Sequence, residues 1–276
     1  LYWYLKGHTD YLNSLGRGAT FKEISKSIVE NIEIPLPDLE KQIDCANTLK
    51  KCWDLMLLRK VQIKQMDNLI KSRFVEMFGD PMVNSMGWLI KSFEDVSCII
   101  TDGEHATPKR ATEGIYLLSA RNILDHAIQL DDVDFIDDKE YERIAKRIVP
   151  RTGDVLLSCS GSIGRCCVVP ENLKFQMVRS VALIRFNDNE VNPIFAEWLI
   201  TTDEVQRQIL KLATQSSQTN LFQGKIKKLR GYIPPLKLQN QFADFVTQTT
   251  KLKFEIQKSL DETQTLMDTL MQEYFG

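Results

Sequence analysis

A long segment that occurs twice constrains the fold more than any other feature of this sequence. Residues 34–79 open on Ile-Pro-Leu-Pro and close on Glu-Met-Phe-Gly, and residues 233–276 open on Ile-Pro-Pro and close on Glu-Tyr-Phe-Gly. Prolines fix an extended entry into each segment, and neither segment contains another Pro or Gly before its last residue. Each copy is therefore predicted to form one long helix, the first running from Asp38 for about 60 Å. A helix of that length acts as a spacer, because a small domain cannot enclose it.

Apolar residues in both predicted helices follow the alternating three- and four-residue spacing of a coiled-coil seam. In the first helix the seam is predicted at Ala46, Leu49, Trp53, Met56, Lys60, Ile63, Asp67, Ile70, Phe74 and Met77. In the second helix it is predicted at Phe242, Phe245, Thr249, Leu252, Ile256, Leu260, Thr263, Met267, Leu270 and Tyr274. The offset between the copies falls from 199 to 197 residues, which predicts a second helix shorter by two residues. Periodicity alone leaves open whether the seam pairs helices within one chain or in a homodimer.

The stretch between the two helices has the pattern of a globular domain. Residues 80–213 contain short apolar runs separated by Gly, Pro, Asn and Asp, which is typical of a mixed α+β domain. Strands are predicted at residues 97–101, 115–119, 132–136, 154–158, 165–169 and 181–186, and helices at residues 137–148 and 193–212. The predicted fold class is α+β: a mixed domain with a small antiparallel or barrel-like sheet, flanked by two long antiparallel coiled-coil helices.

Four segments are predicted along the chain. Residues 1–33 align loosely with the residues that precede the second helix, which indicates the remnant of a preceding domain. Residues 34–79 form the first spacer helix, residues 80–213 the inserted domain, and residues 214–276 a second conserved region with its own spacer helix.

Composition excludes several classes of function. No run of 18 apolar residues is present, so no membrane span is expected. The six cysteines show no CxxC spacing, which favours reduced, packed thiols and a cytoplasmic location over disulfides or zinc ligands. The three histidines are scattered, and there is no nucleophile elbow, phosphate-binding P-loop or glycine-rich cofactor turn. The chain is therefore predicted to catalyse nothing and to bind no metal.

Charge is segregated along the inserted domain. Residues 125–142 contain eight acidic residues and one lysine, whereas residues 143–185 contain eight basic and two acidic residues. Residues 206–230 add six basic residues and no acidic one. Residues 80–213 as a whole carry 15 basic and 21 acidic residues, but a duplex responds to the face that it meets rather than to the total. The segregation therefore favours a nucleic-acid partner.

Three polar loops between predicted strands carry side chains suited to phosphates and base edges. Residues 102–110 end in Thr-Pro-Lys-Arg, residues 119–122 read Ser-Ala-Arg-Asn, and residues 158–165 end in Gly-Ser-Ile-Gly-Arg. Arginine can pair with guanine and asparagine with adenine, and serine hydroxyls beside backbone N–H groups can hold a phosphate. Each loop also has a purely structural interpretation: a solvated hairpin, an Arg-Asn turn held by local hydrogen bonds, and a tight turn that needs glycine.

In combination these motifs resemble the specificity subunit of type I restriction-modification systems. The resemblance rests on the Ile-Pro-Leu-Pro, helix, Phe-Gly-Asp-Pro repeat, the Asp-Gly and Thr-Pro pairs, and the Gly-Asp-Val-Leu-Leu-Ser run before Gly-Ser-Ile-Gly-Arg. It covers nearly the whole chain. It implies that residues 80–213 are a target-recognition domain that reads one half of a bipartite DNA site. The two helices would pack antiparallel, space the recognition domains and dock the modification subunits.

The resemblance also implies a non-catalytic chain within a larger complex. The expected partners are double-stranded DNA, the modification (methyltransferase) subunits, the restriction (motor-nuclease) subunit and a second copy of this chain. No cofactor is expected here, whereas S-adenosylmethionine, ATP and Mg²⁺ are expected on partner subunits. A complete specificity subunit carries two recognition domains, and this chain has one with a remnant. A fragment, a recombination product and a half-subunit that dimerises all remain open.

The DNA contacts that the matched motifs imply lie in the loops and before the last predicted strand. They are Thr107, Lys109, Arg110, Arg121, Asn122, Ser160, Ser162, Arg165, Arg179, Ser180, Gln218 and Asn220. Two other functions compete with this interpretation. The chain could be the specificity portion of a fused restriction-methylation enzyme, or a coiled-coil adaptor whose middle domain binds protein and which has no salt-dependent affinity for DNA.

Overall fold

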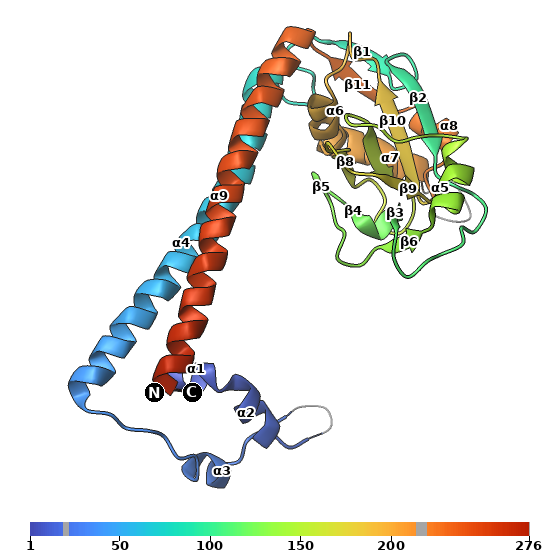
Figure 1. Ribbon diagram of the computed structural model, residues 1–276. Helices are drawn as coiled ribbons and strands as arrows, with labels where there is room; N and C mark the ends of the chain where they lie inside the picture. Colours follow the sequence, from blue (N-terminus) through green and yellow to red (C-terminus); the bar gives the residue numbers. More distant parts are fainter. Residues whose placement is uncertain (19–21, 214–219, 276) are drawn as a thin grey trace. The chain divides into compact units, whose positions relative to one another are not determined.

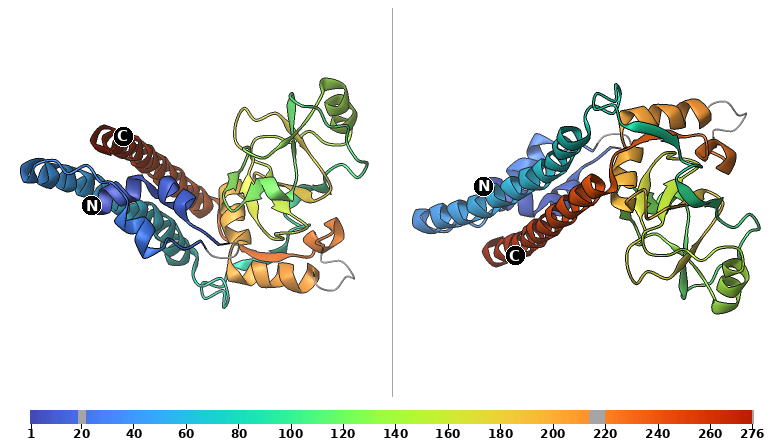
Figure 2. Two further views of the ribbon diagram at one scale, coloured as in Figure 1. Left: turned by 90° about the horizontal axis from the view of Figure 1, so that it is seen from below. Right: turned by 90° about the horizontal axis from the view of Figure 1, so that it is seen from above.

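The computed structural model describes residues 1–18, 22–213 and 220–275, and it divides into two compact units (Figures 1 and 2). The first unit combines Leu1–Leu69 with Gln248–Gly276, and the second unit is Ile70–Thr247. The second unit is therefore inserted in the sequence of the first. Both long helices cross from one unit into the other.

The two long helices are α4 (Leu39–Phe78) and α9 (Leu236–Phe275), each of 40 residues. Asp38 caps α4, since its Oδ1 accepts a hydrogen bond of 2.9 Å from the backbone N–H of Lys41. The prediction of a shorter second helix is wrong. Pro235 directly precedes α9, and its carbonyl accepts the first bond of the helix, from Leu238 N at 2.9 Å. The two missing residues belong to the connection before α9 rather than to the helix.

In the first unit α4 and α9 run antiparallel and side by side, and their seam is close to the predicted one (Figures 1 and 2). The shared core contains Leu49, Met56, Leu260 and Met267. Thr263, predicted as a polar seam position, is also buried.

Four seam predictions are wrong. On α4 the buried positions beside Leu49 are Cys45 and Cys52, whereas Ala46 and Lys60 are exposed. Trp53 is 37% exposed because its ring packs elsewhere: the Lys6 ammonium lies 3.1 Å from the ring centroid. On α9, Leu252 is 59% exposed and takes no part in the seam.

The first unit also contains, among its described residues, the short helices α1 (Tyr2–Gly7), α2 (Thr9–Leu15) and α3 (Lys26–Glu30). The ring of Tyr4 packs edge-on against Phe275 at a centroid separation of 5.8 Å. This contact places α1 against the end of α9, so both chain termini lie at one end of the helix pair (Figure 1).

The second unit is built around a four-stranded antiparallel sheet in the order β2-β10-β7-β8. Its strands are β2 (Ser97–Asp102), β7 (Val155–Ser158), β8 (Cys166–Val168) and β10 (Val181–Phe186). A second sheet, β6-β3-β9, pairs β3 with β6 antiparallel and with β9 parallel. Its strands are β3 (Ile115–Leu118), β6 (Asp134–Ile136) and β9 (Phe175–Met177).

Two small ribbons accompany these sheets: β1 (Leu89–Ser92) with β11 (Arg230–Ile233), and β4 (Ile123–Leu124) with β5 (Ala127–Ile128). The predicted α+β class with a small antiparallel sheet is confirmed. Within the described ranges the sheets are separate and open, so the barrel-like form is not adopted.

The helices of the second unit are α5 (Asp138–Ala145), α6 (Pro193–Ile200), α7 (Asp203–Ala213), α8 (Gln223–Ile226) and the 3₁₀ turn η1 (Ala120–Asn122). The single helix predicted over residues 193–212 is interrupted between α6 and α7. Thr201 and Thr202 end α6, because their hydroxyls donate to the carbonyls of Trp198 (2.9 Å) and Leu199 (2.6 Å).

Aromatic side chains anchor the long helices in this unit. Phe74 and Phe78 of α4, Phe195 of α6 and Phe242 of α9 form one cluster, in which Phe74 and Phe242 have ring centroids 5.3 Å apart. The two chain segments that enter and leave the second unit are thereby joined within it.

Candidate nucleic-acid interface

The predicted loops meet at one end of the main sheet. Because β10 pairs antiparallel with β2 and β7, the beginning of β10 lies beside the ends of both neighbours, as the pairs Ala182–Asp102 and Val181–Ser158 show. The loops after β2 and β7 and the residues before β10 must therefore gather at this end.

Residues 178–180 connect these loops through backbone hydrogen bonds. Val178 N donates to Leu118 O at the end of β3, and Arg179 N donates to Glu104 O in the loop after β2, both at 3.0 Å. Ser180 O accepts a bond of 2.8 Å from Cys159 N in the turn after β7. The loop cluster is thus held by main-chain contacts that do not depend on the side chains offered to a ligand.

Two glycines allow this close approach. A Cβ on Gly103 would collide with the backbone of Met177 and Val178, so only glycine fits there. Gly164 has φ +94°, and a Cβ on it would lie 2.5 Å from the Gln206 side chain. Gln206 Nε2 donates to Gly164 O at 2.9 Å and so ties the Gly-Ser-Ile-Gly turn to α7.

Four of the predicted contact residues line one cleft of about 280 Å³: Ser160, Arg179, Ser180 and Asn220. Arg179 is exposed, and among the described residues it forms no ion pair. The Ser180 hydroxyl accepts a bond of 3.0 Å from Ala120 N, which joins the cleft to η1.

Asp102 and His105, which the site prediction did not contain, also line the cleft, and Arg147 contacts Asp102. His105 Nε2 lies 2.8 Å from Asp102 Oδ2, and Arg147 contacts the other oxygen of the same carboxylate at 2.6 Å. Arg147 also donates to Gly103 O at 3.1 Å. The dense basic stretch after residue 143 indicated such a residue, but the sequence did not place it beside residues 102–105.

A second cluster contains Arg110 and Arg121, which come together on one carboxylate. Asp134 forms an ion pair with each: its Oδ2 lies 3.0 Å from Arg110 Nε, and its Oδ1 lies 3.2 Å from an Arg121 terminal nitrogen. The other terminal nitrogen of Arg121 lies 3.5 Å from Asp132 Oδ2. Sequence analysis missed Asp134, because it counted residues 125–142 only as an acidic stretch.

Asn122 does not have the accessibility that base reading requires. Its side chain is 1% exposed, and its Oδ1 accepts from Ser119 N (2.9 Å) and Ser119 Oγ (3.1 Å). Its Nδ2 donates to Gln129 O (3.1 Å) and Asp132 O (2.9 Å). Every strong donor and acceptor of the amide is engaged, so Asn122 holds the turn together, which favours the structural interpretation for this residue.

The remaining predicted residues lie on the same loops. Thr107, Lys109 and Ser162 are exposed, and Arg165 is half-buried with its backbone N–H donating to Ser158 Oγ at 3.0 Å. Gln218 lies outside the described residues.

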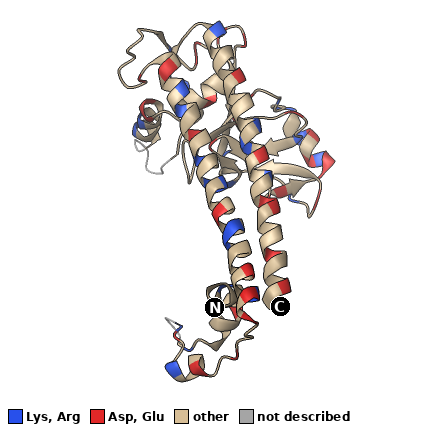
Figure 3. Cartoon of the chain, turned by 90° about the vertical axis from the view of Figure 1, so that its left-hand side faces the viewer, with Lys and Arg blue, Asp and Glu red and all other residues tan. Residues whose placement is uncertain are grey.

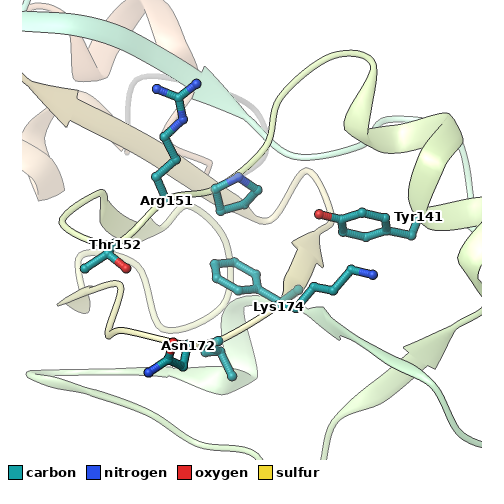
Figure 4. Close-up of a pocket in the computed structure, with 8 residues that line it drawn as sticks. Tyr141, Arg151, Thr152, Asn172 and Lys174 are labelled. Carbon is teal, nitrogen blue, oxygen red and sulfur yellow. The ribbon is translucent and has the colours of Figure 1, made fainter.

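A larger hollow of about 490 Å³ lies beside the beginnings of β7 and β9 and is lined by Tyr141, Arg151, Thr152, Asn172 and Lys174, among others (Figure 4). Figure 4 shows the charged ends of Arg151 and Lys174 pointing away from each other. The Lys174 ammonium instead lies 4.5 Å from the centroid of the Tyr141 ring. Because the cations do not converge, this hollow lacks the geometry of a site for a single anion.

Five of the six cysteines are buried, and Cys98 is exposed. Cys159, Cys166 and Cys167 are buried, and burial raises the pKa of the Cys159 thiol to about 12. Within the described part of the chain, no group of three His, Cys, Asp or Glu side chains could hold a metal ion, and no helix is long and apolar enough to cross a membrane. Figure 3 shows acidic and basic residues interspersed along α4, whereas α9 carries only acidic charged residues after Lys258.

Fold and site together define a protein in which a repeated helix pair carries an α+β binding unit. The family model described as type I restriction modification DNA specificity domain matches residues 1–66 and 98–264, and the chain belongs to this family. It is 20% identical over 297 residues to the type I restriction enzyme EcoBI specificity subunit of Escherichia coli, covering 98% of this chain and 62% of that protein. It is also 20% identical over 261 residues to the MjaVIII specificity subunit of Methanocaldococcus jannaschii, covering 88% of this chain and 61% of that protein.

Solved structures share the fold. The S subunit of a type I restriction-modification system from M. genitalium has a TM-score of 0.67 at 15% identity, covering 100% of this chain and 71% of that chain. The HsdS subunit from Thermoanaerobacter tengcongensis has a TM-score of 0.51 at 19% identity, covering 98% and 67%. The chain spans 45 to 62% of the length of the curated relatives it matches.

Proposed function

We propose that this chain is a sequence-specific DNA-binding specificity subunit of a type I restriction-modification complex, acting in the cytoplasm. The observation that carries the proposal is the convergence of Ser160, Arg179, Ser180 and Asn220 on one cleft, beside the Arg110 and Arg121 cluster. Hydroxyl, amide and guanidinium groups at one sheet end are the groups that contact phosphates and base edges. The family membership supports the same function.

In this function the chain performs no chemistry itself. It directs adenine methylation and DNA cleavage by its partners, which are modification (methyltransferase) subunits and a restriction (motor-nuclease) subunit. Those subunits hold S-adenosylmethionine, ATP and Mg²⁺. The exposed faces of the mixed-charge helices α4 and α9 offer them a docking surface, and a second copy of the chain can supply the other half of a bipartite site.

The test is to co-express the chain with the modification subunit of its own system and to map adenine methylation by long-read sequencing. A discrete bipartite motif is the expected result. A palindromic motif would mean that two copies act together, and an asymmetric motif would require a second recognition domain. Absence of methylation, with the modification subunit shown to be bound, would contradict the proposal.

A binding assay separates this function from that of a protein-binding adaptor. DNA binding through Arg179 and the arginines of the neighbouring loops should weaken steeply with salt, because log K falls by about 0.9 per neutralised phosphate for each unit of log salt concentration. Replacing Arg179 by Ala should reduce the slope of log K against log salt concentration by the contribution of one phosphate contact, about 0.9. An adaptor would show no salt-dependent affinity for any duplex.

A further inference from the structure

The paired arginines of the interface differ in which of their nitrogens remain available. A guanidinium carries five N–H groups, one on Nε and four on the two terminal nitrogens. The nearest approach of Arg110 to Asp134 is through Nε, at 3.0 Å, and among the described residues its terminal nitrogens form no hydrogen bond, so they remain available to another ligand. Arg121 faces carboxylates with both terminal nitrogens, at 3.2 Å to Asp134 and 3.5 Å to Asp132.

This difference decides which arginine can read a base. The strongest base contact of arginine is a bidentate bond from its planar fork to guanine O6 and N7 in the major groove. The nearest carboxylate contact of Arg110 is made by Nε, whereas on Arg121 a carboxylate lies within 3.5 Å of each of the two terminal nitrogens that make the fork. We propose that Arg110 reads a guanine through this fork, that Asp134 positions Arg110 from behind, and that Arg121 braces Asp134 rather than reading a base.

The local backbone supports this assignment. Ala111 N donates to Phe135 O at 2.8 Å, which fixes the residue after Arg110 against strand β6 next to Asp134. Asp134 is itself fixed in β6 by its pairing with Leu117 of β3. The Arg110 side chain is 55% exposed and that of Asp134 27%, so the arginine fork lies outside the carboxylate that holds it.

A held arginine gives more specificity than a free one. A free arginine loses rotamer freedom when it binds a base, and part of its interaction energy is spent on that ordering. The contact with Asp134 restricts the Arg110 side chain before DNA arrives. The carboxylate also neutralises part of the local positive charge, so the contribution of Arg110 is weighted toward discrimination and away from non-specific attraction.

The inference rests on the proposed function, and one experiment separates the two. The full chain, with its own modification subunit, is used to select duplexes from a pool of double-stranded oligonucleotides that contain a randomised segment. Wild type is compared with Arg110→Lys, which keeps the charge and loses the fork, and with Asp134→Asn, which keeps the shape and loses the charge. Arg121→Lys tests the competing assignment, in which Arg121 reads the base, and circular dichroism checks that each variant is folded.

We expect Arg110→Lys to reduce the preference for guanine at one position of the selected motif by about 5- to 150-fold, the range of a lost bidentate contact, while the other positions keep theirs. Asp134→Asn should weaken the preference at the same position by a smaller factor and add nothing to Arg110→Lys in the double variant. Asp134→Glu, which keeps the carboxylate, should retain most of the guanine preference that Asp134→Asn loses. Arg121→Lys should leave the guanine preference in place.

An unchanged guanine preference in Arg110→Lys would overturn the assignment, as would its loss in Arg121→Lys instead. A uniform loss of affinity for all sequences in Arg110→Lys would make Arg110 a phosphate contact and would also overturn it. If wild type selected no motif, the proposed function itself would fail. If wild type selected a motif whose guanines were all independent of Arg110, only the present inference would fail.

Discussion

Replacing Asn122 by alanine gives the sharpest test of whether the Arg-Asn turn is structural. The substitution removes four hydrogen bonds, two accepted by Oδ1 from Ser119 and two donated by Nδ2 to carbonyls. At about 0.5–1.5 kcal/mol of net stability each, the sum would be about 2–6 kcal/mol. The carbonyls belong to the exposed residues Gln129 and Asp132, which water can reach after the substitution. The lower part of the range therefore applies, about 2–3 kcal/mol.

The assay is thermal and urea unfolding of the full chain followed by circular dichroism and intrinsic fluorescence. For a unit of roughly 180 residues, a loss of about 2–3 kcal/mol lowers the melting temperature of the second unit by about 5–10 °C. Arg121→Ala is the matched control. The Arg121 side chain neighbours Asn122 and is 47% exposed, and its ion pairs are worth about 1 kcal/mol or less. A change of less than about 0.5 kcal/mol in Asn122→Ala would refute the structural role.

Three further predictions concern buried and exposed groups of the second unit. Asp154, 2% exposed, pairs with Arg185 at 2.7 Å, so Asp154→Ala should destabilise the unit by about 3–5 kcal/mol in urea unfolding, because an uncompensated charge remains. The hydrogen bonds from Arg143 hold the pKa of Glu140 below its usual value of 4.5, so this pair contributes stability at higher pH that is lost as pH falls through the lowered pKa. Glu140→Gln should therefore flatten the stability curve below about pH 4.5 in acid unfolding. Cys98 is the exposed cysteine among the six, so a thiol reagent such as DTNB should show one fast-reacting thiol, and Cys98→Ser should abolish that fast phase.

Much of the architecture could be predicted because its signals are local. The apolar spacing and the flanking prolines set both long helices, and the first helix begins directly after Asp38, as predicted. The β1–β11 ribbon was missed because its strands, Leu89–Ser92 and Arg230–Ile233, lie near opposite ends of the inserted sequence. No local sequence pattern predicts a pairing over such a separation. The break between α6 and α7 was missed because two threonine hydroxyls, rather than Gly or Pro, end the first of these helices.

The candidate site was predictable as a set of loops and not as a set of roles. Polar and glycine-rich stretches at strand ends identified the segments that meet at the end of the sheet. The role of each side chain depends on partners from other strands. Asp134 of β6 lies nearest to Nε of Arg110 but to a terminal nitrogen of Arg121, and this difference separates the two arginines. For Asn122 the residue type suits both a base contact and a turn, and only its burial and four hydrogen bonds distinguish the two.

The insertion of one unit within the other has a consequence for the order of folding. The first unit draws its two helices from segments separated by roughly 180 residues, and closing a flexible loop of that length costs about 5 kcal/mol of chain entropy. The second unit is continuous in sequence, and it brings its own entry and exit together through the rings of Phe74 and Phe242. Once the second unit has folded, the α4 and α9 segments of the first unit start close together, so their pairing no longer has to close the long loop. During synthesis on the ribosome, α4 cannot pair with α9 until the inserted unit has been made and α9 has emerged.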